Sequence, residues 1–415
     1  MKTLRVASLA VASLCSLAAM DAAAQQLPEA AGKGLVEGVC SGCHQTNMIS
    51  QSSGYSAEQW RELVATMIDL SPSPETRDEI VNYLTTNFPP NTRRAAKPVP
   101  GPMQIQVREW TVPTLGQRSR DPVEAPDGSI WWVGQFGNVM GRLDPRTGEM
   151  KEYQLPPKAL PHSINIDADG NPWYTGNGNG TIGKLDPGTG KVTEYKMPDP
   201  AARDPHTAEF DRNGILWFTA QQSNFVGRLD PKTGEVRLVK VKTPGAKPYG
   251  IKIDAQGNPW FTCNGSNCLV KIDPATMELT EVKLPIPATT SRRLDIADDG
   301  MIWYVNSSQG KLGRYNPQSG AIKEWDSPSG PRSHPYAIAV IDGIVWYNES
   351  GVRPDMLVRF DPKTETFQSW PIASGGVHAG IVRHMRATRD GDLLIHQSST
   401  NRIMLVPVRS ATPTR

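Results

Sequence analysis

The chain has 415 residues, a net charge of +2 and 21% charged residues, so it is long enough for two or three domains and shows no basic bias toward nucleic acid. Its 37 glycines and 36 prolines favour short strands joined by turns over a mainly helical protein. Beyond the N-terminal segment, no stretch approaches the roughly 20 apolar residues of a membrane helix, so we predict no membrane span.

Residues 1–24 have the pattern of a cleaved signal peptide. Lys2 and Arg5 precede a short apolar stretch, and Ala22 and Ala24 supply the small residues that a signal peptidase needs. We therefore expect the mature protein to be exported to the periplasm.

Residues 25–88 are predicted to form a small helical domain with a haem-attachment motif. Cys40 and Cys43 have the CxxCH spacing that forms two thioethers with a porphyrin, and His44 completes the motif as an iron ligand. We expect one covalently bound haem c at Cys40, Cys43 and His44.

The sixth iron ligand is predicted by exclusion. Met67 lies on a predicted amphipathic helix over Ser56–Leu70, and no histidine other than His44 occurs before His162. An open site, Lys33 or Tyr55 are the alternatives. Methionine ligation raises the reduction potential of a haem relative to two histidines.

This domain, with a further helix predicted over residues 73–88, resembles class I cytochromes c. The spacing of Trp60 and Met67 is similar to that in the haem domains of quinohaemoprotein amine dehydrogenases. The resemblance implies an all-α electron-transfer domain that exchanges electrons with a redox partner protein in the periplasm.

Residues 89–102 are a proline-rich linker, expected to be stiff and extended. Residues 103–410 repeat a turn glycine followed by a tryptophan strand, and four short strands per unit indicate a β-propeller rather than the alternative, a β-solenoid. A strand over Gln106–Pro113 should complete the last blade and close the ring. Seven turn glycines mark the blades: Gly128, Gly170, Gly214, Gly257, Gly300, Gly343 and Gly391.

Cys263 and Cys268 are predicted to lie at the two ends of a loop between strands. An oxidising compartment would allow them to form a disulfide. Two free buried thiols are the alternative.

The repeat resembles the virginiamycin B lyase (streptogramin B lyase) family over residues 103–406, on Lys247-Pro248-Tyr249-Gly250-Ile251, Gly257-Asn258-Pro259-Trp260-Phe261-Thr262 and Gly183-Lys184-Leu185-Asp186. The resemblance implies seven blades, an active face at one mouth of the channel, and a magnesium-dependent elimination that opens a cyclic depsipeptide.

The family's two histidine positions fall on Tyr336 and Arg383, the latter with His384 beside it. Its two glutamate metal ligands fall near Ile381 or Val382 and on Ser398 or Ser399, where no carboxylate occurs. A hard cation requires such oxygen ligands. The sequence therefore argues against a magnesium site of the family type.

The start of each innermost strand should bring one side chain to the same channel mouth. Three arginines, two histidines and two tyrosines there predict a polar or anionic small-molecule ligand, with His162, His206 or His384 as possible bases. A water-filled mouth without a ligand is the alternative. These positions are Arg120, His162, His206, Tyr249, Arg292, Tyr336 and Arg383.

A neighbouring column of polar residues, after the second strand of each blade, should share this face. It contains one acid, Glu349, which is either a lone acid of the site or the salt-bridge partner of an arginine.

Three functions remain open on the sequence. We favour a periplasmic c-type cytochrome whose propeller binds a partner or small molecule. The second is an oxidoreductase subunit whose propeller contributes to a substrate site. The third is a magnesium-dependent streptogramin B lyase.

Overall fold

The computed structural model describes residues 27–40, 49, 53–90, 95–372 and 382–409. The predicted signal peptide, Cys43 and His44 lie outside these residues. The chain divides into two compact units, residues 1–61 with 70–91 and residues 62–69 with 92–415. No helix of the described residues has the length and apolar character needed to cross a membrane.

The first unit is helical. Its described helices are α2 (Lys33–Cys40), α5 (Pro74–Asn87) and the first part of α4 (Ala57–Ala65), whose residues 62–65 are assigned to the second unit. α2 packs against α5, and the Tyr83 hydroxyl donates to the Pro28 carbonyl oxygen over 2.7 Å. The first and last of the described helices therefore pair.

α4 begins as predicted but ends early. Ser56 and Gln59 form a reciprocal capping box, with hydrogen bonds of 3.0 and 3.3 Å. The predicted helix was to reach Leu70, but α4 ends at Ala65. The Thr66 hydroxyl donates to the Leu63 carbonyl oxygen over 2.8 Å and so competes with the next helical turn.

The second unit is a seven-bladed β-propeller, and each blade is a four-stranded antiparallel sheet. Blade 1 contains β2 (Ser119–Glu124), β3 (Ile130–Gly134), β4 (Val139–Leu143) and β5 (Met150–Gln154). Blade 2 contains β6 (Pro161–Ile166), β7 (Pro172–Gly176), β8 (Thr181–Leu185) and β9 (Val192–Lys196). Blade 3 contains β10 (Pro205–Phe210), β11 (Leu216–Ala220), β12 (Phe225–Leu229) and β13 (Val236–Lys240).

The remaining blades repeat this order. Blade 4 contains β14 (Pro248–Ile253), β15 (Pro259–Cys263), β16 (Cys268–Ile272) and β17 (Leu279–Lys283). Blade 5 contains β18 (Ser291–Ile296), β19 (Ile302–Asn306), β20 (Lys311–Tyr315) and β21 (Ile322–Asp326). Blade 6 contains β22 (Pro335–Ile341), β23 (Ile344–Glu349), β24 (Met356–Asp361) and β25 (Thr366–Pro371). Blade 7 contains β26 (Met385–Ala387), β27 (Leu393–Gln397), β28 (Arg402–Val406) and β1 (Arg108–Thr111).

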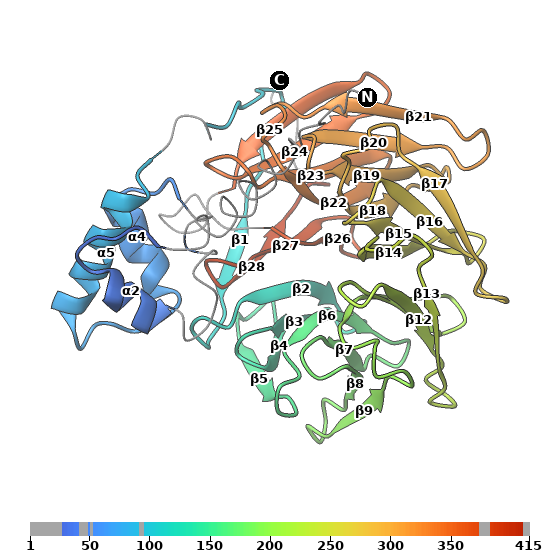
Figure 1. Ribbon diagram of the computed structural model, residues 1–415, viewed down its shortest axis with the longest axis horizontal. Coiled ribbons are helices and arrows are strands. Elements are labelled where there is room, and N and C mark those ends of the chain that lie inside the picture. Colours follow the sequence, from blue (N-terminus) through green and yellow to red (C-terminus); the bar gives the residue numbers. More distant parts are fainter. Residues whose placement is uncertain (1–26, 41–48, 50–52, 91–94, 373–381, 410–415) are drawn as a thin grey trace, which may run out of the picture. The chain divides into compact units, whose positions relative to one another are not determined.

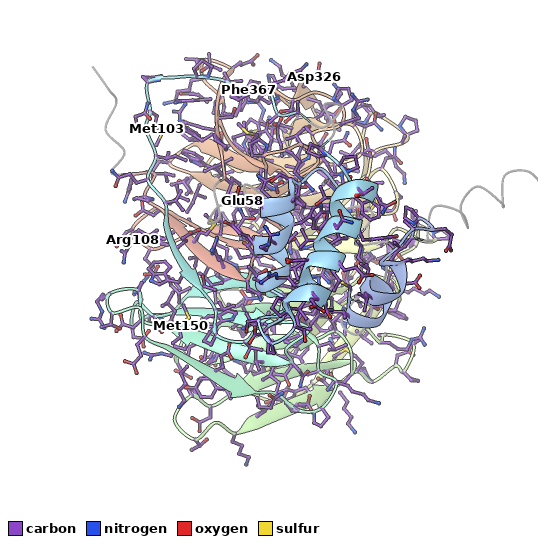
Figure 2. All side chains as sticks on the ribbon, turned by 90° about the vertical axis from the view of Figure 1, so that its left-hand side faces the viewer. Glu58, Met103, Arg108, Met150, Asp326 and Phe367 are labelled. Atoms are coloured by element: carbon purple, nitrogen blue, oxygen red, sulfur yellow. A yellow bond between two sulfur atoms is a disulfide. The ribbon has the colours of Figure 1, made fainter. Side chains whose placement is uncertain are left out.

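The ring closes by the predicted exchange of strands. β1 pairs antiparallel with β28, with Trp110 opposite Ile403. Figure 1 shows the light-blue β1 beside the red β28, and Figure 2 shows Met103 and Arg108 along the extended segment that leads into β1. This pairing gives blade 7 its fourth strand, so the N-terminal strand joins the two ends of the propeller.

The repeated aspartate turns position the tryptophans. In blade 2, Asp167 accepts hydrogen bonds from the Asn171 backbone N–H and from Trp173 Nε1, over 2.8 and 2.9 Å. Gly170 occupies the left-handed region at φ +85°, which the tight turn requires. The indole is therefore fixed by its own turn and then buried between neighbouring blades, which explains the spacing of glycine and tryptophan in the repeat.

Cys263 and Cys268 form a disulfide between the end of β15 and the start of β16. The two Cα atoms are 5.4 Å apart, and both residues are buried. This outcome selects the disulfide over the two free thiols.

The linker prediction was partly wrong, because the described part of it binds to blade 6. Ala96 donates its backbone N–H to the Arg353 carbonyl oxygen over 3.1 Å. Val99 and Ser369 exchange two further hydrogen bonds. The outer edge of the blade offers unpaired polar groups, and an extended proline-rich chain satisfies them.

Candidate functional site

The channel mouth begins at a backbone irregularity shared by blades 1 to 6. The register of the innermost hairpin shifts in each, for example between Pro161 and Ile164 in blade 2. Such bulges re-aim side chains and are common beside active sites. Consecutive residues of one strand can then both serve the channel, as Arg292 and Arg293 do in blade 5.

The structure brings the predicted mouth residues together. The rings of His162 and His206 are 3.6 Å apart between centroids, and those of His206 and Tyr249 are 4.3 Å apart. The Arg292 guanidinium lies 4.5 Å from the ring centre of Tyr336. We call the seven residues the mouth ring: Arg120, His162, His206, Tyr249, Arg292, Tyr336 and Arg383.

The arginines of the mouth ring keep unused donors. Arg120 is 2% exposed and donates to Gln135 Oε1 over 2.9 Å. Its Nε and Nη2 atoms find no acceptor among the described residues, and the same holds for Nε of Arg292 and of Arg383. Buried donors without an acceptor are costly, so these groups favour an anionic ligand or ordered water.

Below the mouth ring lies a second layer that the sequence did not indicate. Arg293 is 2% exposed and crosses the channel, donating to the Arg383 carbonyl oxygen and to Thr207 Oγ1 over 3.0 Å each. It also pairs with Asp121 over 3.5 Å. The Arg293 side chain of blade 5 thereby links blades 1, 3 and 7. We call Arg293 and Asp121, with their partners, the charged floor of the channel.

Two mouth histidines are held without charge. Burial, followed by nearby arginines, lowers the pKa of His162 and of His206 well below the usual value. His162 Nδ1 lies 3.1 Å from the His206 carbonyl oxygen, which can only accept. The neutral His162 ring therefore carries its proton on Nδ1, which leaves Nε2 with a free lone pair.

His384, the third predicted base, belongs to the second layer instead. Its Nδ1 accepts from Arg386 Nε over 3.3 Å and lies 3.8 Å from Asp121. Burial and Arg293 lower the pKa of His384 well below its usual value. It stays neutral and bonded to its neighbours, so it fits a structural role better than that of a base.

Glu349 is buried, and the prediction that it pairs with an arginine was wrong. Its carboxylate accepts from Ser327 Oγ over 2.6 Å and from the Ser329 backbone N–H over 2.8 Å. The Ser329 hydroxyl also donates to it. No arginine forms an ion pair with Glu349 among the described residues. The loop after β21 supplies the hydrogen-bond donors to Glu349.

The donor set does not fit the magnesium ion that the family resemblance implies. Among the described residues, no group of three or more histidine, cysteine, aspartate or glutamate side chains could hold a metal. Asp121 is paired with Arg293, and Glu349 is bound by two serines. Arginine donors occupy the mouth in their place.

The helical unit carries only part of the predicted haem site in its described residues. Cys40 is the last residue of α2, while Cys43 and His44 are not described. Met67, which belongs to the second unit, follows α4 in a turn and is half-buried, so its predicted helical setting was wrong. Lys33, an alternative ligand, is paired with Glu29 and with Glu37.

An unpaired indole marks the interior of this unit. Trp60 is 3% exposed and packs edge-on against Tyr55, with ring centroids 5.0 Å apart. Its Nε1 has no hydrogen-bond acceptor among the described residues. A buried N–H without a partner is consistent with an absent polar group, such as a haem propionate.

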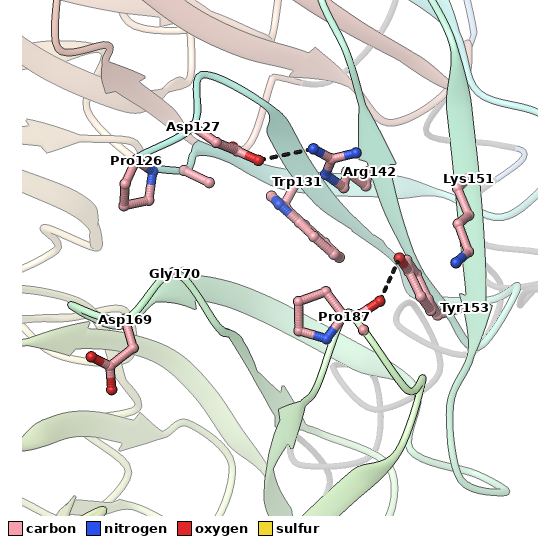
Figure 3. A pocket seen from close by; sticks show the side chains of 11 residues that line it. Pro126, Asp127, Trp131, Arg142, Lys151, Tyr153, Asp169, Gly170 and Pro187 are labelled. Atoms are coloured by element: carbon pink, nitrogen blue, oxygen red, sulfur yellow. Dashed lines mark hydrogen bonds and ion pairs between the residues drawn. The ribbon is translucent and has the colours of Figure 1, made fainter.

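A separate cavity of about 530 Å³ lies between blades 1 and 2, at the opposite end of β2 from the mouth ring (Figure 3). Two of its polar groups are paired: Arg142 with Asp127 over 2.8 Å, and the Tyr153 hydroxyl with the Pro187 carbonyl oxygen over 3.3 Å. The stack of Trp131 on Tyr153 recurs in other blades, so this cavity is a groove of the repeat.

The comparisons with known proteins agree with this fold. The model of the virginiamycin B lyase family matches residues 105–365. The structure of virginiamycin B lyase from Staphylococcus aureus is 24% identical, covers 73% of this chain and 99% of that chain, and superposes with a TM-score of 0.66. A streptogramin B lyase structure is 25% identical and covers 73% and 98%, with a TM-score of 0.66.

More distant propellers match in fold alone. Kuenenia stuttgartiensis hydrazine synthase is 14% identical over 71% of this chain and 97% of that chain, with a TM-score of 0.57. No curated protein matches the chain in sequence. Unrelated functions thus share this architecture, and function has to be argued from the mouth.

Proposed function

The chain belongs to the virginiamycin B lyase family, and on this premise we propose that its propeller binds an anionic substrate at the mouth ring and acts on it by a lyase-type proton abstraction. The observation that carries the proposal is the set of buried arginine donors without acceptors at Arg120, Arg292 and Arg383. The family match supports a lyase activity more directly than it supports electron transfer.

The chemistry of elimination suits this mouth. A base removes a proton from carbon, and a carbon–oxygen bond breaks as the double bond forms. Negative charge that develops on the substrate needs a cationic or Lewis-acid partner. Arg120 and Arg383 can stabilise it here by donating hydrogen bonds, where the family resemblance implies a metal ion.

The histidines of the ring are weak candidates for the base. Their low pKa keeps His162 and His206 neutral at pH 7, so both can accept a proton. The same low pKa makes each of them a poor competitor for a proton held on carbon. They are better suited to orient the substrate by hydrogen bonds.

The test of anion binding uses malonate as the probe and neutral malonamide as its matched control. Malonate should raise the melting temperature of the wild-type protein, and Arg120→Gln should abolish the rise. Arg212→Gln, an exposed arginine far from the ring in the repeat, should behave as wild type. Equal stabilisation by malonamide, or an unchanged response of Arg120→Gln, would contradict the proposal.

Magnesium-dependent cleavage of a streptogramin B antibiotic is the narrower lyase alternative. The family match favours it, and the donor set of the mouth opposes it. Incubation with quinupristin, with magnesium and with a chelator, separates the two. Ring-opening that stops with the chelator would establish the alternative.

A second function is proposed for the helical unit, on the CxxCH motif and the unpaired Trp60 Nε1. Cys40, Cys43 and His44 would hold a haem c, and Met67 would supply the sixth ligand. The haem would supply one-electron transfer to a periplasmic redox partner, either by itself or as part of an oxidoreductase.

A pyridine haemochrome spectrum of the protein, expressed with a haem-attachment system, tests this second function. One haem c per chain is expected, and Cys40→Ala with Cys43→Ala should lose the covalent attachment. A full-length protein without bound haem under these conditions would refute it.

A further inference from the structure

Tyr336 has an unusual hydrogen-bonding position in the mouth ring. Its hydroxyl oxygen lies 3.3 Å from Arg292 Nη1 and 3.1 Å from Arg383 Nη1, and both guanidiniums donate to it. The hydroxyl of Tyr249 also forms a short hydrogen bond with this oxygen. Both tyrosines are buried, each with 3% of its surface exposed.

Counting protons limits the state of this cluster. A phenol oxygen has two lone pairs and one hydrogen, and a guanidinium can only donate. Arg292 and Arg383 therefore use both lone pairs of a neutral Tyr336. A third donor, the Tyr249 hydroxyl, can be accommodated only if Tyr336 has lost its own proton. If Tyr336 keeps its proton, it donates that proton to the Tyr249 oxygen, so one proton lies between the two oxygens in both states.

The charges around the pair favour the loss of a proton. Arg118 and Arg120 add positive charge near Tyr336, and the Arg293 guanidinium lies 5.3 Å from the ring centre of Tyr249. The other titratable neighbours are His206, next to Tyr249, and His334, whose ring centroid is 6.0 Å from that of Tyr336. The nearby carboxylate of Asp121 is already paired with Arg293.

The two tyrosines shift in opposite directions. Burial alone raises the pKa of Tyr336, but Arg292 and Arg383 outweigh it and hold that pKa well below the usual value. Burial and the neighbouring Tyr336 raise the pKa of Tyr249. Opposite shifts in one hydrogen-bonded pair indicate that the pair loses its first proton easily and keeps its second.

We propose that Tyr249 and Tyr336 share a single proton at neutral pH, with Tyr336 as the phenolate, and that this phenolate is the base of the propeller. The catalytic part rests on the lyase-type function proposed above. Tyr336 occupies the position where the family resemblance places a histidine. An ionised Tyr336 has a free lone pair that can accept a proton, and its negative charge is held in place by Arg292 and Arg383.

In that reaction the proton on the substrate carbon moves to the Tyr336 oxygen. The electron pair of the C–H bond forms the double bond, and the C–O bond breaks with its pair on oxygen. The leaving oxygen takes a proton from solvent water, and the hydroxide that this leaves removes the proton from Tyr336 and restores the phenolate. Arg292 and Arg383 then hold the neutral phenol and the anionic group of the substrate.

Tyrosinate absorbance near 295 nm tests the proposal without a substrate. At pH 8 an ordinary tyrosine is about 1% ionised, so nine others among the chain's 10 tyrosines contribute about 0.1 equivalent together. The wild-type protein should show about one full tyrosinate in excess of Tyr336→Phe. Difference spectra between full-length variants of equal haem content remove the haem background.

Tyr304→Phe is the matched control. Its hydroxyl is buried too, but it donates to Glu324 over 2.9 Å, and burial beside that carboxylate raises its pKa. This variant should keep the full signal. Arg383→Gln should shift the ionisation to higher pH while Tyr336 stays in place, which covers the case that Tyr336→Phe folds poorly.

A wild-type protein whose tyrosines all ionise above pH 10 would overturn the proposal. So would a signal that persists in Tyr336→Phe. Failure of the lyase-type function gives a different result: the tyrosinate is present at pH 8, but malonate fails to stabilise the protein.

Discussion

Lowering the pH from about 7 to about 5.5 should destabilise the propeller, because four of its histidines are buried without charge. His162, His206, His384 and His396 are all 5% exposed or less. Burial is the first cause that lowers the pKa of each of them well below the usual value. The folded protein therefore does not take up these protons in this pH range.

The magnitude follows from linkage. An unfolded histidine with a pKa of about 6.5 gains about 1.4 kcal/mol by protonation at pH 5.5 and about 0.2 kcal/mol at pH 7. The folded state gains neither, so each histidine costs about 1.2 kcal/mol of stability, and four cost about 5 kcal/mol. The direction of the effect follows from these values. Above pH 6.5 the unfolded histidines are mostly neutral and the free energy of unfolding is highest, and it decreases as the pH falls because only the unfolded state takes up protons.

The carboxyl groups with shifted pKa values contribute little to the change in stability between pH 7 and pH 5.5. Asp127 and Asp144 have pKa values lowered to about 2, so they titrate far below pH 5.5. Asp295 acts in the opposite direction, because burial raises its pKa. Its one proton offsets at most one histidine.

Urea unfolding at several pH values measures the effect. His396→Gln should remove about 1.2 kcal/mol of the difference between pH 7 and pH 5.5. Gln397→Met changes a buried neighbour that does not titrate, and it should leave the pH dependence intact. A free energy of unfolding that is equal at pH 7 and pH 5.5 would refute the argument, since it would mean that the folded histidines accept protons.

Three further predictions concern single contacts. Arg293→Met should cost about 3–5 kcal/mol of stability in urea unfolding, because it leaves the buried Asp121 charge unpaired; a loss below about 1 kcal/mol would contradict the second layer. Cys263→Ala with Cys268→Ala should cost about 2 kcal/mol, as expected for a short loop with a sequence separation of 5, and no loss would show that the disulfide is dispensable. In the haem-loaded protein, Met67→Ala should abolish the low-spin methionine–haem spectrum, and an unchanged spectrum would exclude Met67 as the ligand.

The sequence predicted the propeller because its repeat is a local signal. Each turn glycine, aspartate and tryptophan form one hydrogen-bonded unit, as Gly170, Asp167 and Trp173 do, so the period is visible without tertiary contacts. Strand exchange was predictable for the same reason, since β1 carries the pattern that blade 7 lacks.

The charged floor of the channel was not predictable, because it depends on geometry beyond one blade. Arg293 follows Arg292 directly, and simple strand alternation places its side chain away from the channel. The bulge in β18 re-aims the side chains, and only the structure shows its partners Asp121 and Thr207 in other blades.

The misplaced residues have similar causes. Glu349 belongs to a polar column, but its hydrogen-bond partners Ser327 and Ser329 lie in the loop before blade 6, which the repeat pattern does not indicate. Met67 was assigned to a helix because the apolar residues around it recur with helical spacing. That spacing does not show that the Thr66 hydroxyl donates to a carbonyl oxygen of the preceding turn, where the helix ends.

The central claim is that the mouth ring binds an anion, and a bromide soak of crystals tests it most directly. Anomalous scattering locates bromide without assumptions about the natural ligand. We predict a bromide ion within hydrogen-bonding distance of Arg120, Arg292 or Arg383, absent in crystals of Arg120→Gln with Arg383→Gln. Bromide found only at exposed surface lysines and arginines, with the mouth ring empty, would contradict the account.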